Sequence, residues 1–271
     1  MDRKKIAIIF DFDDTLAPDS TSAFLEWYGI DVEYFWEKEV NPLLLKGWDP
    51  IPAFLFGLIE KSKNAGKDKG ITLDKFRSFG AQLKSFQGVT ELINRLKAIG
   101  EENKCKVEFF IISSGIEEII KNTSIAPLFK EIWASAFHFN PQGTIEFPRK
   151  VVSFTDKTRY LFQINKGIFG EKSFQNPYMV NERVLEDDIY IPLNNFIYVG
   201  DGYTDIPCFS IVKRYQGVPV GVYEKKNKKK YQSAWRFVKD ERVSTLVSAD
   251  YSINSDLSNT LEMALLNIIN R

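Results

Sequence analysis

Three short apolar runs, each followed at once by small or acidic residues and a turn, constrain the fold of this chain most strongly. The runs cover residues 5–10, 107–112 and 196–199. Strands buried on both faces of a parallel sheet have this strongly apolar character. Helical patterns lie between the second and third runs, over 115–121 and 155–164. The sequence therefore predicts a Rossmann-like α/β fold in which crossover helices connect parallel strands.

The polar residues that follow these runs are expected to meet at one edge of the sheet. In an open α/β sheet, ligands bind beyond the carboxyl ends of the strands. The candidate site residues at these ends are Asp11, Asp13, Asp14 and Thr15 after the first run, Ser113, Ser114 and Gly115 after the second, and Asp201 and Asp205 after the third.

The segment 17–86 has no convincing strand and is rich in aromatic residues within helical patterns. Apolar residues recur at intervals of three and four over 73–86, with Thr72 available as an N-cap. We predict an all-helical domain over 17–86, inserted into an α/β core domain formed by 1–16 and 87–271. The lysine- and glycine-rich stretch 61–70 is expected to be an exposed loop of the insertion.

The rest of the chain predicts further elements of the core. Alternating residues over 134–147 flank Pro141-Gln142-Gly143, as in a β-hairpin. Short strands are expected at 218–223 and 248–251, and an amphipathic helix at 257–269. The stretch 170–193 receives no assigned structure or role. The basic loop 225–230 is read by default as a solvated loop, and a contact for an anionic substrate is the alternative.

The overall composition excludes several classes of function. The 36 basic side chains balance 36 acidic ones, so nothing suggests binding to nucleic acid or to a membrane surface. The N-terminal apolar run is too short for a signal peptide, and no segment has the apolar length of a transmembrane helix. Two cysteines, Cys105 and Cys208, are too few for a disulfide scaffold. We therefore expect a cytoplasmic protein with reduced thiols.

Clustered carboxylates at one sheet edge require a cation. Each pair of like charges at about 4 Å costs on the order of 4 kcal/mol at an effective dielectric constant near 20. Oxygen ligands without histidine or thiolate favour Mg²⁺, which keeps several waters and also binds substrate phosphate. A solvated acidic turn, with Asp14 as a local cap, is the alternative reading of Asp11 and Asp13 taken alone.

Two further groups are suited to an anion. Ser114 and Glu117 fit a capping box, which leaves Ser113 free beside the amides of a helix N-terminus. Lys157 falls in the first turn of a helix capped by Thr155, where the helix dipole disfavours a cation. A phosphate at that terminus would remove the conflict. Lys150 and Lys166 are the alternatives if the helix begins elsewhere.

The ordered set DFDDT, SSG, TDK and GDGYTD resembles the four motifs of the haloacid dehalogenase (HAD) superfamily. The insertion after the first motif resembles the helical cap of its phosphoserine phosphatase-like branch. Motif order, strand context and the position of the insertion agree independently. The resemblance covers nearly the whole chain, and it implies a Mg²⁺-dependent phosphatase with a HAD-like core.

The resemblance also implies a role for each matching residue. Asp11 would be the nucleophile that forms an aspartyl-phosphate, and Asp13 the general acid and base. The phosphoryl group would be held by Ser113, Ser114, Gly115 and Lys157, with Thr15 supporting the turn. Mg²⁺ would be held by Asp11, the backbone carbonyl of Asp13, Asp201 and Asp205; Asp205 would ligate directly, ligate through water, or orient the site.

Three readings of the function follow from these residues. A phosphatase acting on a small phosphorylated metabolite is the leading one, and Asp13 favours it because relatives that cleave carbon–halogen bonds lack this second aspartate. A phosphotransferase or phosphomutase with the same intermediate, and a phosphate-binding regulatory module without turnover, are the alternatives. The glutamate that contacts the substrate amine in phosphoserine phosphatase is replaced here by Ser20, so phosphoserine is doubtful as a substrate.

Overall fold

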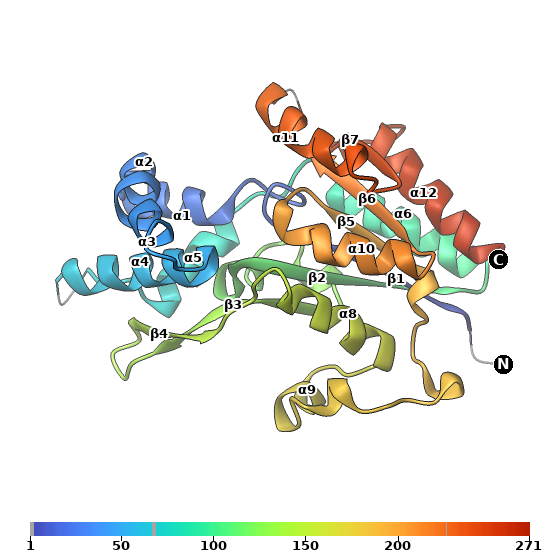
Figure 1. The fold of residues 1–271 in the computed structure, drawn as a ribbon, viewed down its shortest axis with the longest axis horizontal. Helices are drawn as coiled ribbons and strands as arrows, with labels where there is room; N and C mark the ends of the chain where they lie inside the picture. Colours follow the sequence, from blue (N-terminus) through green and yellow to red (C-terminus); the bar gives the residue numbers. More distant parts are fainter. Residues whose placement is uncertain (1–2, 67–68, 226) are drawn as a thin grey trace.

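A seven-stranded sheet lies at the centre of the computed structural model, which describes residues 3–66, 69–225 and 227–271 (Figure 1). Its strand order is β4-β3-β2-β1-β5-β6-β7, and every pair is parallel except β3 with β4. The predicted α/β fold is therefore confirmed. The strands are β1 (Lys5–Phe10), β2 (Lys106–Ile116), β3 (Glu131–Phe139), β4 (Ile145–Lys150), β5 (Phe196–Gly200), β6 (Val218–Tyr223) and β7 (Thr245–Ser248).

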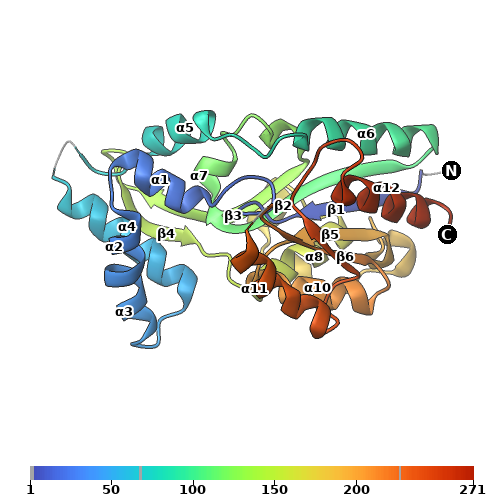
Figure 2. The same cartoon turned by 90° about the horizontal axis from the view of Figure 1, so that it is seen from above.

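Helices cover both faces of the sheet (Figure 2). Ile6, Ile8 and Phe10 of β1 pack in one apolar cluster with α6 and α12, whereas Ala7 and Ile9 pack in a second cluster with α8, α10 and α11. This alternation explains why the strand reads as an unbroken apolar run. The covering helices are α6 (Val89–Glu102), α8 (Asp156–Lys166), α10 (Ile206–Arg214), α11 (Lys228–Lys239) and α12 (Asp256–Ile269).

The segment 17–86 is helical, as predicted, and lies beyond the carboxyl ends of the strands (Figure 1). Its apolar cluster also includes Ile116, Ile119, Phe137 and Ile145 from the sheet side, so the division into two domains stays a prediction. Its helices are α1 (Ser20–Tyr28), α2 (Val32–Tyr34), a π-helical turn (Phe35–Val40), α3 (Asn41–Leu44), α4 (Pro50–Asn64) and α5 (Leu73–Gln82).

Most predicted elements are present with small shifts. Thr72 caps α5, the β3–β4 hairpin brackets Pro141-Gln142-Gly143, and α4 extends to Asn64 into the stretch predicted as a loop. The last strand is displaced: it covers Thr245–Ser248, not 248–251, because these residues pair with β6. The loop predicted over 225–230 is wrong in its second half, because α11 begins at Lys228. Lys67 and Lys226, in the two predicted lysine-rich loops, lie outside the described residues.

The stretch 170–193 forms a long excursion between α8 and β5. It contains α9 (Glu171–Gln175) and two single 3₁₀ turns (Met179–Asn181 and Glu186–Asp188), followed by a third turn (Leu193–Asn195). Lys166 of α8 donates hydrogen bonds to the carbonyls of Val180 and Glu182, which fixes the excursion to the core. None of the helices in the described part of the chain combines the length and the apolar character that crossing a membrane requires.

Candidate active site

Two neighbouring strands bring three aspartates together. Asp11 follows β1, and Asp201 and Asp205 follow β5; β1 and β5 are paired in the sheet, and the Asp11 amide continues the ladder by donating to Val199. One carboxylate oxygen from each aspartate lies within 4.8 Å of the other two. The sequence predicted this juxtaposition because carboxyl ends of parallel strands share an edge.

Lys157 reaches the same cluster from the first turn of α8. Its ammonium nitrogen lies 3.0 Å from Asp11 Oδ2 and 2.7 Å from Asp205 Oδ1, and its side chain has no exposure to solvent. Burial alone would lower the pKa of Lys157, but the two carboxylates outweigh it and raise that pKa above its usual value. Lys157 is therefore a fixed cation, which offsets part of the acidic charge.

The two alternatives to Lys157 are engaged elsewhere. Lys150 pairs with Glu117, and Lys166 binds the carbonyls of the 170–193 excursion. Thr155 does precede α8, as predicted, but its side chain makes no capping hydrogen bond. Ser153 instead donates to Asp156 at this helix start.

Asp205 has protein partners on both carboxylate oxygens. Its Oδ1 accepts from Lys157 and from the Tyr198 hydroxyl at 2.8 Å, and its Oδ2 accepts from the Gly202 amide at 3.1 Å. Gly200 must be glycine here, because a Cβ would lie 2.5 Å from the Asp205 carboxylate. Of the predicted roles for Asp205, this arrangement favours orientation of the site over direct ligation of a metal.

Burial disfavours the ionised form of the two other acids of the cluster, Asp11 and Asp201. Burial raises the pKa of Asp11 to about 7, although the charge of Lys157 opposes this. Burial raises the pKa of Asp201 well above its ordinary range, and the charges of Asp11 and Asp205 add to the effect. A bound cation would favour the ionised form of both groups.

The Asp13 carboxylate contacts the second motif and the start of α1. Its Oδ1 accepts from the Ser20 amide at 2.8 Å, and a Cβ on Gly115 would lie 2.4 Å from its Oδ2. Only glycine at 115 leaves room for the carboxylate. Burial raises the pKa of Asp13 to about 8, and the charge of Asp19 adds to the shift. Asp13 is therefore able to hold a proton near neutral pH.

The second motif departs from its predicted local structure. The predicted capping box of Ser114 with Glu117 is wrong, and the helix predicted over 115–121 is present only in part. Pairing with β3 extends β2 to Ile116, so the short helix α7 (Glu117–Ile120) begins after it with no side-chain cap. Ser113 is buried and its hydroxyl oxygen accepts from the Gly115 amide at 3.0 Å. The Ser114 hydroxyl is buried and has no hydrogen-bond partner among the described residues. Both hydroxyl groups thus keep a donor free.

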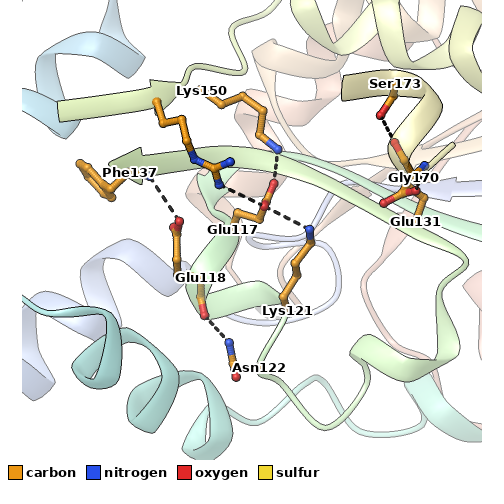
Figure 3. A network of polar contacts seen from close by, with 10 residues as sticks. Glu117, Glu118, Lys121, Asn122, Glu131, Phe137, Lys150, Gly170 and Ser173 are labelled. Carbon is orange, nitrogen blue, oxygen red and sulfur yellow. Dashed lines mark hydrogen bonds and ion pairs between the residues drawn. The ribbon is translucent and has the colours of Figure 1, made fainter. Parts of the chain in front are cut away.

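Glu117 belongs to an ion-pair network instead of a cap (Figure 3). It lies between Lys121 and Lys150, with Arg149 3.9 Å away, whereas Glu118 points toward the backbone of Phe137. Burial alone would raise the pKa of Glu117, but Lys150 and Lys121 outweigh it and lower that pKa. Burial raises the pKa of Glu118 to about 7. The network ties the second motif to the strand that leads into α8.

Contacts from the C-terminal part of the chain hold the first motif, and sequence patterns did not indicate them. The Tyr251 hydroxyl donates to the Thr15 carbonyl at 2.7 Å, and Lys230 of α11 lies 2.6 Å from Asp14 Oδ2. The Thr15 hydroxyl is buried and finds no hydrogen-bond partner in the part of the chain that the structure describes. Asp14 has a φ of 54°, the left-handed conformation that aspartate tolerates better than most residues. No local spacing links these residues, so sequence could not reveal the pairs.

The residues present fit a Mg²⁺ ion. The candidate ligands are all carboxylate or carbonyl oxygens, and no histidine or thiolate accompanies them among the described residues. Asp11 and Asp201 offer the carboxylates. The cluster has more acids than cations, and its buried carboxylates repel one another. A divalent ion would compensate this excess negative charge.

Comparisons with known proteins identify the fold. No family model matches the sequence. An uncharacterized protein of Borreliella burgdorferi is 29% identical over 281 residues, covering 94% of each chain. Among solved structures, a phosphoserine phosphatase determined as a phospho-aspartyl intermediate analogue has a TM-score of 0.57 at 15% identity, covering 96% of this chain and 99% of its own. The fold is that of the HAD phosphatases.

Two further solved structures extend the likeness. A HAD-family hydrolase from Salmonella enterica serovar Typhi has a TM-score of 0.58 at 13% identity, covering 90% of this chain and 67% of its own. Cytosolic 5′-nucleotidase IIIB bound to cytidine has a TM-score of 0.53 at 12% identity, covering 98% and 85%. The HAD-like fold that the motifs predicted is thus confirmed over nearly the whole chain.

Proposed function

We propose that the protein is a Mg²⁺-dependent phosphatase that hydrolyses a small phosphorylated metabolite through an aspartyl-phosphate on Asp11. The observation that carries this proposal is the position of Asp11: its carboxylate lies at the end of β1 within 4.8 Å of Asp201 and Asp205 oxygens and 3.0 Å from Lys157. Carboxylate nucleophiles with this type of charge compensation are used in phosphoryl transfer.

In the first step, Asp11 attacks phosphorus and the bond to the leaving oxygen breaks. Asp13 gives its proton to that oxygen, so the product leaves as an alcohol and Asp13 becomes a carboxylate. The raised pKa of Asp13, about 8, supports this role because the group holds a proton at neutral pH. Lys157 and the Ser113 hydroxyl would bind the equatorial phosphoryl oxygens.

In the second step, water hydrolyses the intermediate. The Asp13 carboxylate takes a proton from the water, the new oxygen–phosphorus bond forms, and the bond between phosphorus and Asp11 breaks. Inorganic phosphate leaves, and both aspartates return to their starting states. Asp11, Asp201 and the Asp13 carbonyl would hold Mg²⁺, with Asp205 orienting the site, and the ion would supply charge neutralisation for the phosphoryl group.

The helical segment 17–86 would act as a cap that excludes water and selects the substrate. Ser20, at the start of α1, supports this assignment because its amide holds the Asp13 carboxylate. We place the protein in the cytoplasm. Cys105 and Cys208, both buried and free, are compatible with a reducing compartment.

Hydrolysis of p-nitrophenyl phosphate tests the proposal. We expect turnover with Mg²⁺, loss of turnover with a chelator, and restoration when Mg²⁺ is added back. Asp11→Asn should abolish turnover while the protein remains folded. Activity that persists in this variant, or that a chelator does not reduce, would contradict the proposal.

A further inference from the structure

The pair formed by Lys230 and Asp14 lies next to the candidate active site but has no part in the reaction proposed above. Lys230 Nζ is 2.6 Å from Asp14 Oδ2 and 3.4 Å from Glu224. Asp14 is half-buried, and burial raises its pKa although Lys230 opposes the rise. Ion pairs with one partner partly desolvated are weakened less by solvent than fully exposed ones.

Lys230 is held in this position by the helix that carries it. Asn227 caps α11 by accepting from the Lys230 amide, and Ala234 and Phe237 are buried against the sheet. The first turn of α11 contains three lysines and no acid, although a helix N-terminus disfavours cations. Asp14 and Glu224 offset this penalty for Lys230.

The charge of Asp14 acts on the acidic cluster. Asp14 directly follows Asp13, whose backbone carbonyl is a proposed metal ligand, so the Asp14 charge lies within electrostatic reach of the site. Five aspartates therefore gather around the end of β1, whereas Lys157 and Lys230 are the ammonium groups that pair with them in the described part of the chain. Lys157 contacts the acids that would bind Mg²⁺, and Lys230 contacts the acid beside them.

We propose that Lys230 is a positioning residue that acts through Asp14 to balance the affinities of the site for Mg²⁺ and for a phosphate dianion. A site with more negative charge binds a divalent cation more tightly and repels a dianion more strongly. By neutralising Asp14, Lys230 weakens the binding of Mg²⁺ and strengthens the binding of phosphate. This inference rests on the proposed function, since it concerns the same metal and the same phosphoryl group.

The test compares Lys230→Met with Lys229→Met. Lys229 is the matched control because it is exposed, lies in the same helical turn and forms no ion pair within the described residues. Mg²⁺ binding to metal-free protein is measured by calorimetry, and inorganic phosphate binding is measured as inhibition at saturating Mg²⁺. For Lys230→Met we expect Mg²⁺ to bind about threefold to tenfold more tightly and phosphate to bind more weakly by a similar factor. Lys229→Met should match the wild type.

Asp14→Asn should show the opposite split, with weaker Mg²⁺ binding and tighter phosphate binding. The double variant, Asp14→Asn with Lys230→Met, should return both affinities toward the wild type, because the net charge is restored. Circular dichroism and melting temperature establish that each variant is folded.

The outcomes separate this inference from the function on which it rests. Weaker binding of both Mg²⁺ and phosphate by Lys230→Met would mean that the pair only orders the loop. Equal affinities in Lys230→Met and Lys229→Met would mean that the charge of Lys230 has no effect. Either result overturns this inference and leaves the proposed function intact. A wild-type protein that binds no Mg²⁺ would overturn the proposed function and this inference together.

Discussion

Lys157 Nζ lies 2.7 Å from Asp205 Oδ1, and neither side chain has any exposure to solvent. This buried pair joins α8 to the turn after β5, and it also presents the lysine to Asp11. A buried charge that loses its partner is strongly destabilising, so the pair has consequences both for stability and for the proposed chemistry.

Lys157→Met should therefore lower both stability and activity. The change leaves Asp11 and Asp205 buried without their cation, at a cost of about 3–5 kcal/mol in the free energy of unfolding of the metal-free protein. We also expect kcat/KM for p-nitrophenyl phosphate to fall by about 10²–10³-fold. Denaturant unfolding and steady-state kinetics measure the two effects.

Lys166→Met is the matched control, since Lys166 lies on the same helix and was the rival assignment from sequence. Its partners are the carbonyls of the 170–193 excursion, so kcat/KM should stay near the wild-type value. Loss of activity in Lys166→Met with retention in Lys157→Met would reverse the assignment.

The role of Asp13 predicts a dependence on the leaving group. Nitrophenolate leaves without a proton, whereas an alkoxide does not, so Asp13→Asn should still be phosphorylated by p-nitrophenyl phosphate but not by an alkyl phosphate. Hydrolysis of the intermediate should be slow in both cases. Stopped-flow measurement should then show one equivalent of nitrophenol released in a burst, followed by slow turnover. A variant with no burst and equal losses on both substrates would argue against the acid–base role.

Glu117 and Glu118 are adjacent but should respond to pH in opposite ways (Figure 3). The folded pKa of Glu117 lies below its ordinary value of 4.5, so its stabilisation is present above that pH and is lost as pH falls through the folded pKa. Glu117→Gln should therefore destabilise the protein at pH 8, with a difference that shrinks in acid.

Glu118 has a folded pKa of about 7, above its ordinary 4.5, so its contribution is favourable below pH 4.5 and is lost as pH rises through 7. Glu118→Gln should stabilise the protein at pH 8 by about 1–3 kcal/mol, because the amide stays neutral and its oxygen can still accept from Phe137. Denaturant unfolding at pH 3, pH 5 and pH 8 measures both variants, since the Glu117 effect shrinks only below pH 4.5. Destabilisation by Glu118→Gln at pH 8 would contradict this account.

The interface between the helical segment 17–86 and the sheet should contribute much of the free energy of unfolding. Phe76 of α5 is fully buried and stacks on Phe137 of β3, with ring centroids 5.8 Å apart. Phe76→Ala should cost about 3–5 kcal/mol in the free energy of unfolding. Phe147→Ala, at an aromatic residue of β4 that is 66% exposed, serves as the control and should cost about 0.5 kcal/mol or less. Equal losses of unfolding free energy in the two variants would show that this interface is not a shared core.

The parts of the site that sequence predicts well are those that follow from sheet topology. Asp11, Asp201 and Asp205 come together because their strands are neighbours and run in the same direction. Lys157 was predicted from a local conflict between its charge and the helix dipole, and the structure places it between two carboxylates. Each of these inferences uses either residues close together in the sequence or the fixed geometry of a parallel sheet.

The features that the sequence did not predict depend on contacts between residues far apart in the chain, or on strand pairing that competes with a local helix signal. The Ser114–Glu117 spacing matches a capping box, but pairing of Ile116 with Ser135 keeps the chain extended at that point. The contacts of Lys230 with Asp14 and of Tyr251 with Thr15 join opposite ends of the chain, and no periodicity marks them. Tertiary pairing decided each of these cases.

The most direct test of the account is to trap the proposed intermediate. Wild-type protein and Asp13→Asn are mixed with Mg²⁺ and p-nitrophenyl phosphate, quenched in acid within the turnover time, and digested for peptide mass spectrometry. We expect one phosphoryl group on the peptide that contains Asp11, lost on treatment with hydroxylamine and more abundant in Asp13→Asn. Turnover with no phosphoryl group on Asp11, or with the group on another residue, would contradict the central claim.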